Sequence, residues 1–296
     1  MTEHKLISTP TRTLDIMKRY DIKMKKSLGQ NFIIEPNILH KMIETGAIDE
    51  TTTVIEIGPG IGALTEVLAR HAKRVLAFEI DQRFIKILGE TLAPYKNVEV
   101  VHRDILKVDF QASEYEWLAQ EERLVVVANL PYYITTPIIM HLLESELPFE
   151  SLIMMMQKEV AERMTAEVGT KAYNSLTIAI QNEMEAKISF VVPKHVFIPQ
   201  PNIDSAILHL KRRKAALVEV EDPQAFQSFV KTAFKQRRKT LWNNLKASYV
   251  TENFSQEELR EVLETAGIEA KRRAETLTIQ EFAHLYNETI VFQQIN

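Results

Sequence analysis

Short apolar segments alternate with amphipathic segments along the first two thirds of the chain, and this alternation limits the fold more than any other feature. Residues 53–57 form an apolar run typical of a buried strand, the glycine-rich turn 58–62 follows, and a helix-like segment begins at Leu64. Further strand-like runs are 74–80, 98–101, 124–128, 152–156, 188–192 and 206–210. The pattern predicts an α/β fold with a mostly parallel sheet, helices on both faces and a closing antiparallel pair.

The pattern changes after residue 210, where the charge run 211–214 begins and no further strand–glycine–helix unit follows. Helices are predicted at 223–234, 237–249, 256–266 and 279–286. We therefore predict an N-terminal extension with one helix (1–24), a sheet domain (25–210) and a small all-α domain (211–296).

Composition restricts the class of protein. The 296 residues are 45% hydrophobic and 26% charged, as in globular proteins. The sequence contains no run of 18 apolar residues, so we expect no membrane span. The first residues lack a secretory pattern. The absence of cysteine excludes disulfides and thiolate metal sites, and the scattered histidines suggest no metal site. We expect a cytoplasmic, monomeric protein. Because the net charge is −4, any nucleic-acid surface must be a local basic patch.

Polar residues follow three successive predicted strands. Gly58 and Gly60 let the backbone approach a ligand, and the next helix N-terminus attracts negative charge. Glu79 can accept hydrogen bonds from two ribose hydroxyls, and Asp104 can bind an adenine amino group. Strand ends of this kind bind ligands in open α/β sheets. Both a nicotinamide dinucleotide and S-adenosylmethionine fit, and Glu56 before the turn favours the second.

The sequence Asn129-Leu130-Pro131-Tyr132 follows the fourth strand and favours the methyl donor more strongly. It resembles the pattern that amino-group methyltransferases acting on adenine place at the end of a strand. An exocyclic adenine amine is a poor nucleophile because its lone pair is delocalised into the ring. Acceptors such as the Asn129 side-chain oxygen and the Leu130 carbonyl would localise that pair as charge develops. Pro131 fixes the backbone, and Tyr132 offers a face on which a base can stack. A hydride-transferring enzyme has no need of this group.

With these motifs the chain resembles the small-subunit (16S) ribosomal RNA adenine N6,N6-dimethyltransferase family, from about Lys25 to the end. The residues that carry the resemblance are Gly29-Gln30-Asn31-Phe32, Glu56 to Gly62, Glu79-Ile80-Asp81, Asp104, Asn129 to Tyr132, Gln157-Lys158-Glu159, Phe197 to Pro201 and Asp204-Ser205. The resemblance implies a Rossmann-like, S-adenosylmethionine-dependent methyltransferase fold. Two departures, Tyr133 to Thr136 and Gln200, lie away from the proposed acceptors.

The resemblance also implies the roles of individual residues. Residues expected to bind the donor are Gln30, Asn31, Ile33, Gly58, Gly60, Glu79, Ile80, Asp104, Ile105 and Asn129. The expected catalytic group is Asn129, Leu130, Pro131, Tyr132 and Phe197, with Tyr132 and Phe197 on opposite sides of the target base. The charge runs suggest RNA contacts at Lys25, Lys26, Arg212, Arg213, Arg237, Arg238 and Lys239.

The implied function is dimethylation of N6 of two adjacent adenosines in the 3′-terminal hairpin of small-subunit ribosomal RNA, within immature 30S subunits and ribosome biogenesis. No metal or covalent intermediate is required, because a sulfonium methyl group is already activated. Alternatives are a large-subunit ribosomal RNA adenine methyltransferase of the macrolide-resistance type, a DNA adenine methyltransferase, a nicotinamide dehydrogenase and a non-catalytic assembly factor.

Overall fold

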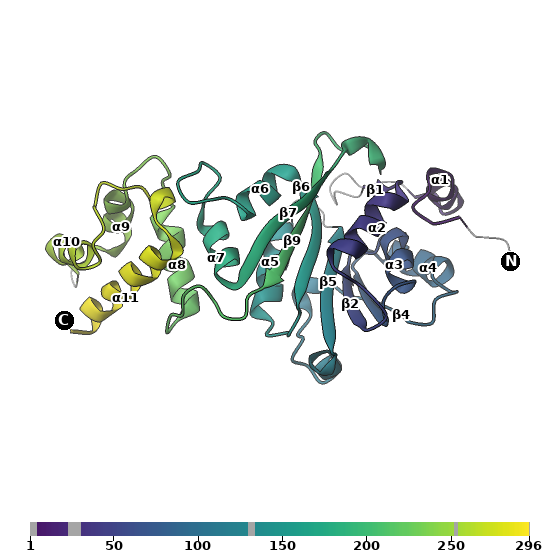
Figure 1. Ribbon diagram of the computed structural model, residues 1–296, viewed down its shortest axis with the longest axis horizontal. Coiled ribbons are helices and arrows are strands. Elements are labelled where there is room, and N and C mark those ends of the chain that lie inside the picture. Colours follow the sequence, from purple (N-terminus) through teal and green to yellow (C-terminus); the bar gives the residue numbers. More distant parts are fainter. Residues whose placement is uncertain (1–4, 23–30, 130–133, 252–253, 296) are drawn as a thin grey trace. The chain divides into compact units, whose positions relative to one another are not determined.

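The computed structural model describes residues 5–22, 31–129, 134–251 and 254–295, which form two compact units (Figure 1). The first unit contains residues up to 161 together with 187–212, and the second contains 162–186 together with 213–296. Residues 162–186 thus group with the C-terminal helices, whereas the domain boundary that we expect from the sequence lies at residue 210.

A seven-stranded sheet dominates the first unit, in the order β4-β3-β2-β5-β6-β9-β7. Its strands are β2 Thr52–Ile57, β3 Arg74–Glu79, β4 Val98–His102, β5 Arg123–Asn129, β6 Ser151–Gln157, β7 Met184–Val192 and β9 Ser205–Arg212. The neighbours from β4 to β6 are parallel, and β9 pairs with β6 antiparallel. This arrangement confirms the predicted α/β, Rossmann-like sheet.

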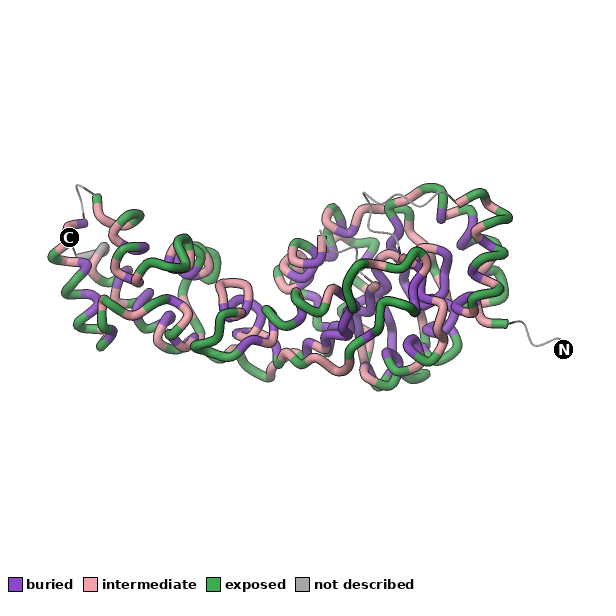
Figure 2. Tube along the Cα trace, turned by 90° about the horizontal axis from the view of Figure 1, so that it is seen from above, coloured by how far each residue is buried: buried purple, intermediate pink, exposed green. Residues whose placement is uncertain are grey.

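Every residue of β2 is buried, which indicates that helices cover both faces at the centre of this sheet. These helices are α2 Pro36–Thr45, α3 Ala63–Ala69, α4 Gln82–Thr91 and α5 Thr135–Glu144. The short helix α6 Lys158–Met164 follows β6, and the boundary between the two units falls within it. Nearly all residues of β2 and β6 are buried, and buried positions are drawn in purple in Figure 2. The Asp81 side chain accepts a hydrogen bond from Arg83 N, as expected of an N-cap, so α4 begins directly where β3 ends.

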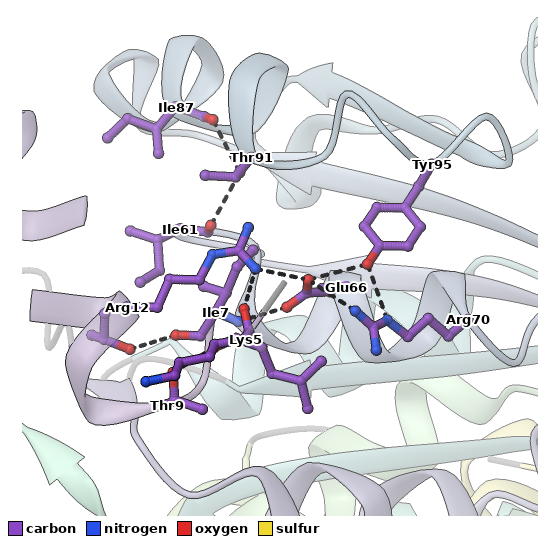
Figure 3. A network of polar contacts seen from close by, with 12 residues as sticks. Lys5, Ile7, Thr9, Arg12, Ile61, Glu66, Arg70, Ile87, Thr91 and Tyr95 are labelled. Atoms are coloured by element: carbon purple, nitrogen blue, oxygen red, sulfur yellow. Dashed lines mark hydrogen bonds and ion pairs between the residues drawn. The ribbon is translucent and has the colours of Figure 1, made fainter. Parts of the chain in front are cut away.

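The N-terminal helix α1 (Pro10–Arg19) is fixed to the first unit by one buried carboxylate. Glu66 of α3 is 1% exposed and accepts a hydrogen bond of 2.6 Å from the main-chain nitrogen of Ile7 (Figure 3). Its other oxygen lies 3.2 Å from Arg12 and 3.1 Å from the Tyr95 hydroxyl. Thr9 stands at the N-cap of α1, but its hydroxyl donates to Leu6 O instead of capping the helix.

The second unit is helical and has its own aromatic core, in which Phe226 and Phe229 contact Tyr286. Its helices are α7 Ser175–Glu183, α8 Pro223–Ala233, α9 Leu241–Tyr249, α10 Gln256–Thr265 and α11 Ile279–Ile295. The predicted start of α9 at Arg237 is wrong. Because the Thr240 side chain caps Asn243 N, the helix begins at Leu241 and the basic residues before it lie in a turn.

Candidate functional site

A cavity opens at the carboxyl ends of β2, β3 and β5, where the sequence predicts ligand binding. The predicted site residues that line it are Asn31, Ile33, Gly58, Gly60, Glu79, Ile80, Asp104, Ile105, Asn129 and Phe197. The fold therefore brings together residues that are up to 166 positions apart, from Asn31 to Phe197. These lining residues all belong to the part of the chain that the structure describes.

The glycine turn after β2 has a backbone that side chains rarely adopt. Gly58, Gly60 and Gly62 have φ of 71°, 59° and 90°. Gly58 N donates to Phe78 O, and Gly60 N donates to Glu79 Oε2 at 3.0 Å. The turn is thereby bonded to the end of β3, and α3 begins immediately after it.

Glu79 lies at the end of β3 and is 5% exposed. Its Oε1 accepts from Asp81 N at 2.8 Å, while Oε2 accepts from Gly60 N. Burial raises the pKa of Glu79, whereas these main-chain hydrogen bonds lower it. The carboxylate is therefore held rigidly on the cavity wall, in a position suited to accept further hydrogen bonds from a bound hydroxyl group.

Glu56 is the most buried acidic group of the cavity. It is 1% exposed, and burial raises its pKa to about 8. Within the described part of the chain, Glu56 Oε2 and Thr65 Oγ1 are buried without a hydrogen-bond partner. A buried acceptor that lines a cavity without a partner costs free energy unless a ligand supplies a donor. Glu56 is therefore suited to bind a cationic group.

Asp104 is half-buried at the end of β4, and its Oδ1 accepts a hydrogen bond from Leu106 N at 3.1 Å. The next residue, Ile105, is buried, whereas Ile80 is 59% exposed at the edge of the same cavity. Two apolar side chains and a carboxylate in the wall of the same cavity fit a flat heteroaromatic ring that also carries an amino group.

Asn129 is the last residue of β5, and its Nδ2 donates to Asn31 O at 3.4 Å. Phe197 lies in the short strand β8 (Phe197–Ile198), is 3% exposed and lines the same cavity. The other expected catalytic residues, Leu130, Pro131 and Tyr132, lie outside the described residues, as does Gln30. The structure thus places an amide and an aromatic ring in the wall of the same cavity.

A comparison with protein families identifies the family of the chain. A family described as "Ribosomal RNA adenine dimethylase" matches residues 22–286. The chain belongs to this ribosomal RNA adenine dimethylase family. The predicted family and the predicted methyltransferase class of enzyme are thereby confirmed.

Individual relatives agree over nearly the whole chain. It is 53% identical over 287 residues to "Ribosomal RNA small subunit methyltransferase A" of Enterococcus faecalis, covering 97% of each chain. It is 55% identical over 282 residues to the Listeria monocytogenes protein of the same name, covering 95% of this chain and 96% of the relative.

Two solved structures have the same fold as this chain. A dimethyladenosine transferase from Plasmodium falciparum is 28% identical, with a TM-score of 0.73 over 87% of this chain and 98% of that chain. The 23S rRNA methyltransferase ErmE is 27% identical, with a TM-score of 0.66 over 88% and 99%. The predicted Rossmann-like methyltransferase fold is therefore confirmed for this dimethylase family member.

The predicted RNA-contacting residues fall into different environments. In the first unit Arg212 stacks on Phe149, with its guanidinium carbon 4.3 Å from the ring centroid. In the second unit Arg213 Nε donates to Gln181 O. Both arginines are half-buried, whereas Arg237, Arg238 and Lys239 are exposed in the turn before α9. Lys25 and Lys26 lie outside the described residues.

Several residues of the cavity wall were not predicted from the sequence. Phe84 lies one turn into α4, and Arg103 precedes Asp104; both line the cavity. Phe32, which sequence analysis used only as part of a motif, also lines it. The position of Phe84 could have indicated its place in the cavity wall. It lies three residues after the Asp81 cap, and this spacing directs a side chain back toward the end of the strand.

Two features are absent from the described residues, a membrane-spanning helix and a cluster of metal ligands. No helix there is long and apolar enough to cross a membrane. In the same part of the chain, no group of three or more histidine or acidic residues is arranged to hold a metal ion.

Proposed function

We propose that this family member dimethylates N6 of two adjacent adenosines in the 3′-terminal hairpin of small-subunit ribosomal RNA. The curated relatives described above are named small-subunit methyltransferases. The substrate is then the RNA of an immature 30S subunit, the enzyme acts as a monomer in the cytoplasm, and the modification is a step in ribosome biogenesis. The orientation of Asn129 is the observation that carries the proposal.

The Asn129 side chain is suited to accept a hydrogen bond from the target amine. Its nitrogen donates to Asn31 O, so the amide oxygen is the end that remains to accept. An acceptor that tightens as positive charge develops on N6 stabilises the transition state more than the ground state. The attacking nitrogen then loses its extra proton to water.

S-adenosylmethionine is the methyl donor that the cavity fits, and it supplies an electrophilic methyl group on a positively charged sulfur. Glu56, buried with an oxygen that lacks a partner in the described chain, can accept from an ammonium group. Glu79 is placed for ribose hydroxyls, and Asp104 for an adenine amino group. At the turn, Gly60 leaves room for the Phe32 ring, since an added Cβ would meet Phe32 Cε1 at 3.3 Å. Gly58 has open space around it, and its φ of 71° is what favours glycine there.

The remaining proposed contacts are with the target base and with the RNA backbone. Phe197 is proposed to contact the target adenine, which must leave its stack to enter the cavity. In the second unit, main-chain hydrogen bonds join Gly169 to Glu275 and Leu241 to Arg272, which brings three loops together. The exposed basic residues on these loops are Lys171, Lys235, Arg237, Arg238, Lys239, Lys271 and Arg273. This basic loop surface is proposed to bind RNA phosphates.

The proposal is tested by incubating the protein with unmethylated small subunits and labelled S-adenosylmethionine, followed by mass spectrometry of the RNA. We expect two adjacent dimethyladenosines, and we expect Asn129→Ala to abolish transfer while calorimetry still detects donor binding. Asn37→Ala, an exposed change in the same unit, serves as the control and should transfer normally. Label in large-subunit RNA alone would support the macrolide-resistance type of enzyme, and normal turnover by Asn129→Ala would refute the acceptor role.

A further inference from the structure

Residues 31–34, here called the bridging segment, contact separate parts of the cavity wall through their main chain. Asn31 O accepts from the Asn129 side chain. Strand β1 (Phe32–Ile33) pairs antiparallel with β8, with Phe32 opposite Ile198 and Ile33 opposite Phe197. Ile34 N donates to Val196 O at 2.9 Å. The bridging segment therefore connects the proposed catalytic amide with the strand that carries Phe197.

The Phe32 side chain fixes this segment to the opposite part of the cavity, where the glycine turn lies. Phe32 is 7% exposed, and its ring lies so near Gly60 that an added Cβ would be 3.3 Å from Cε1. It also makes an edge-to-face contact with Phe84 of α4, with ring centroids 5.9 Å apart. The ring is thus held between the turn and α4.

The β1–β8 ladder is too short to maintain its own position. Each strand has two residues, and a two-stranded ribbon is at best marginally stable without packing. The buried Phe32 ring supplies such packing on the β1 side, and the hydrogen-bonded ladder transmits it to Phe197. A side chain at the proposed donor site is thereby connected, through this ladder, to the strand that carries the aromatic ring at the proposed base site.

We propose that Phe32 is a positioning residue for methyl transfer, which acts by holding Phe197 against the target adenine. This inference rests on the proposed base contact of Phe197 and adds a residue that itself touches no base. If Phe32 acts only through Phe197, its loss costs nothing more once Phe197 has been removed. If Phe32 served only donor binding or general stability, the two losses would multiply.

A double-mutant cycle separates these cases. Single-turnover rates at saturating donor are measured on small-subunit RNA for the wild type, Phe32→Ala, Phe197→Ala and the double variant. We expect Phe32→Ala to slow transfer by about tenfold or more, as misplacement of a reacting pair does. The double variant should match Phe197→Ala within about twofold. Multiplied losses, or a Phe197→Ala variant as fast as the wild type, would overturn the inference.

A second readout does not depend on activity. In a Phe197→Trp background, Phe32→Ala should make the introduced tryptophan more accessible to acrylamide, whereas Phe32→Leu should restore part of the protection. Phe110→Ala is the matched control, because Phe110 is 5% exposed and packs on Phe78 and Tyr115. It should leave the quenching unchanged. Equal quenching with and without Phe32 would refute the positioning role even if the RNA substrate proved to be a different one.

Discussion

Replacing Glu56 by glutamine tests the most unusual electrostatic feature of the cavity. The side chain is 1% exposed, and burial raises its pKa from 4.5 to about 8. The folded chain therefore keeps a proton that the unfolded chain releases between about pH 4.5 and 8. Stability must fall as the pH rises through this window, because the unfolded state binds fewer protons there.

The magnitude follows from the size of the shift. Each pH unit above the unfolded pKa costs about 1.4 kcal/mol, so at pH 7 the unpaired carboxyl costs roughly 3 kcal/mol. Glutamine occupies nearly the same volume and removes the titration. Glu56→Gln should therefore be more stable than the wild type at pH 7 by up to about 3 kcal/mol, or by roughly 6–12 °C in melting temperature for a domain of this size.

Thermal melts of both proteins from pH 5 to 8.5, without the methyl donor, provide the measurement. The difference in stability should be small at pH 5 and should grow toward pH 8. Glu44→Gln, an exposed change on α2, is the control and should follow the wild type. Calorimetry should show weaker binding of S-adenosylmethionine by Glu56→Gln, because glutamine, unlike the carboxyl group, cannot ionise to pair with the ammonium group of the donor. Parallel pH profiles for Glu56→Gln and the wild type would refute the reasoning.

Two further predictions concern the N-terminal helix and the basic loop surface. Glu66→Ala leaves the buried Ile7 main-chain nitrogen without its acceptor. It should therefore lower the free energy of unfolding by about 1–3 kcal/mol in denaturant and expose α1 to proteases. Glu90→Ala, which removes an exposed ion pair with Arg19, is the control and should have little effect. If both variants lost the same amount of stability, the proposed importance of the buried contact would be contradicted. Replacing Arg238 and Lys239 by glutamine should weaken binding to small-subunit RNA and reduce the slope of log affinity against log salt by about 2. An unchanged slope would remove these two residues from the RNA surface.

The local pattern of the sequence was sufficient to predict the sheet and much of the cavity. Alternating strands and helices imply parallel strands, and the carboxyl ends of parallel strands meet at one edge. Gly58, Glu79, Asp104 and Asn129 each lie at or just after the end of a predicted strand, so their convergence was predictable without coordinates. The capping of α4 by Asp81 was also predictable, because an aspartate at a strand-to-helix junction has a local signature.

Contacts between distant segments could not be predicted in this way. Nothing near Glu66 indicates that its carboxylate binds Ile7, 59 residues away, and nothing near Phe32 indicates that it pairs with Ile198. Side-chain environment was equally inaccessible. Arg212 and Arg238 both belong to charge runs, yet Arg212 stacks on Phe149 and Arg238 is exposed.

The sequence by itself therefore determined which segments form the strands and which family the chain resembles, because these depend on local periodicity and on residue type. Only the tertiary structure decided which groups are buried, and hence that Glu56 has a raised pKa and that Phe32 joins the two parts of the cavity. The physical reason is that desolvation and long-range pairing depend on what the fold places around a side chain, and neighbours in the sequence do not specify this.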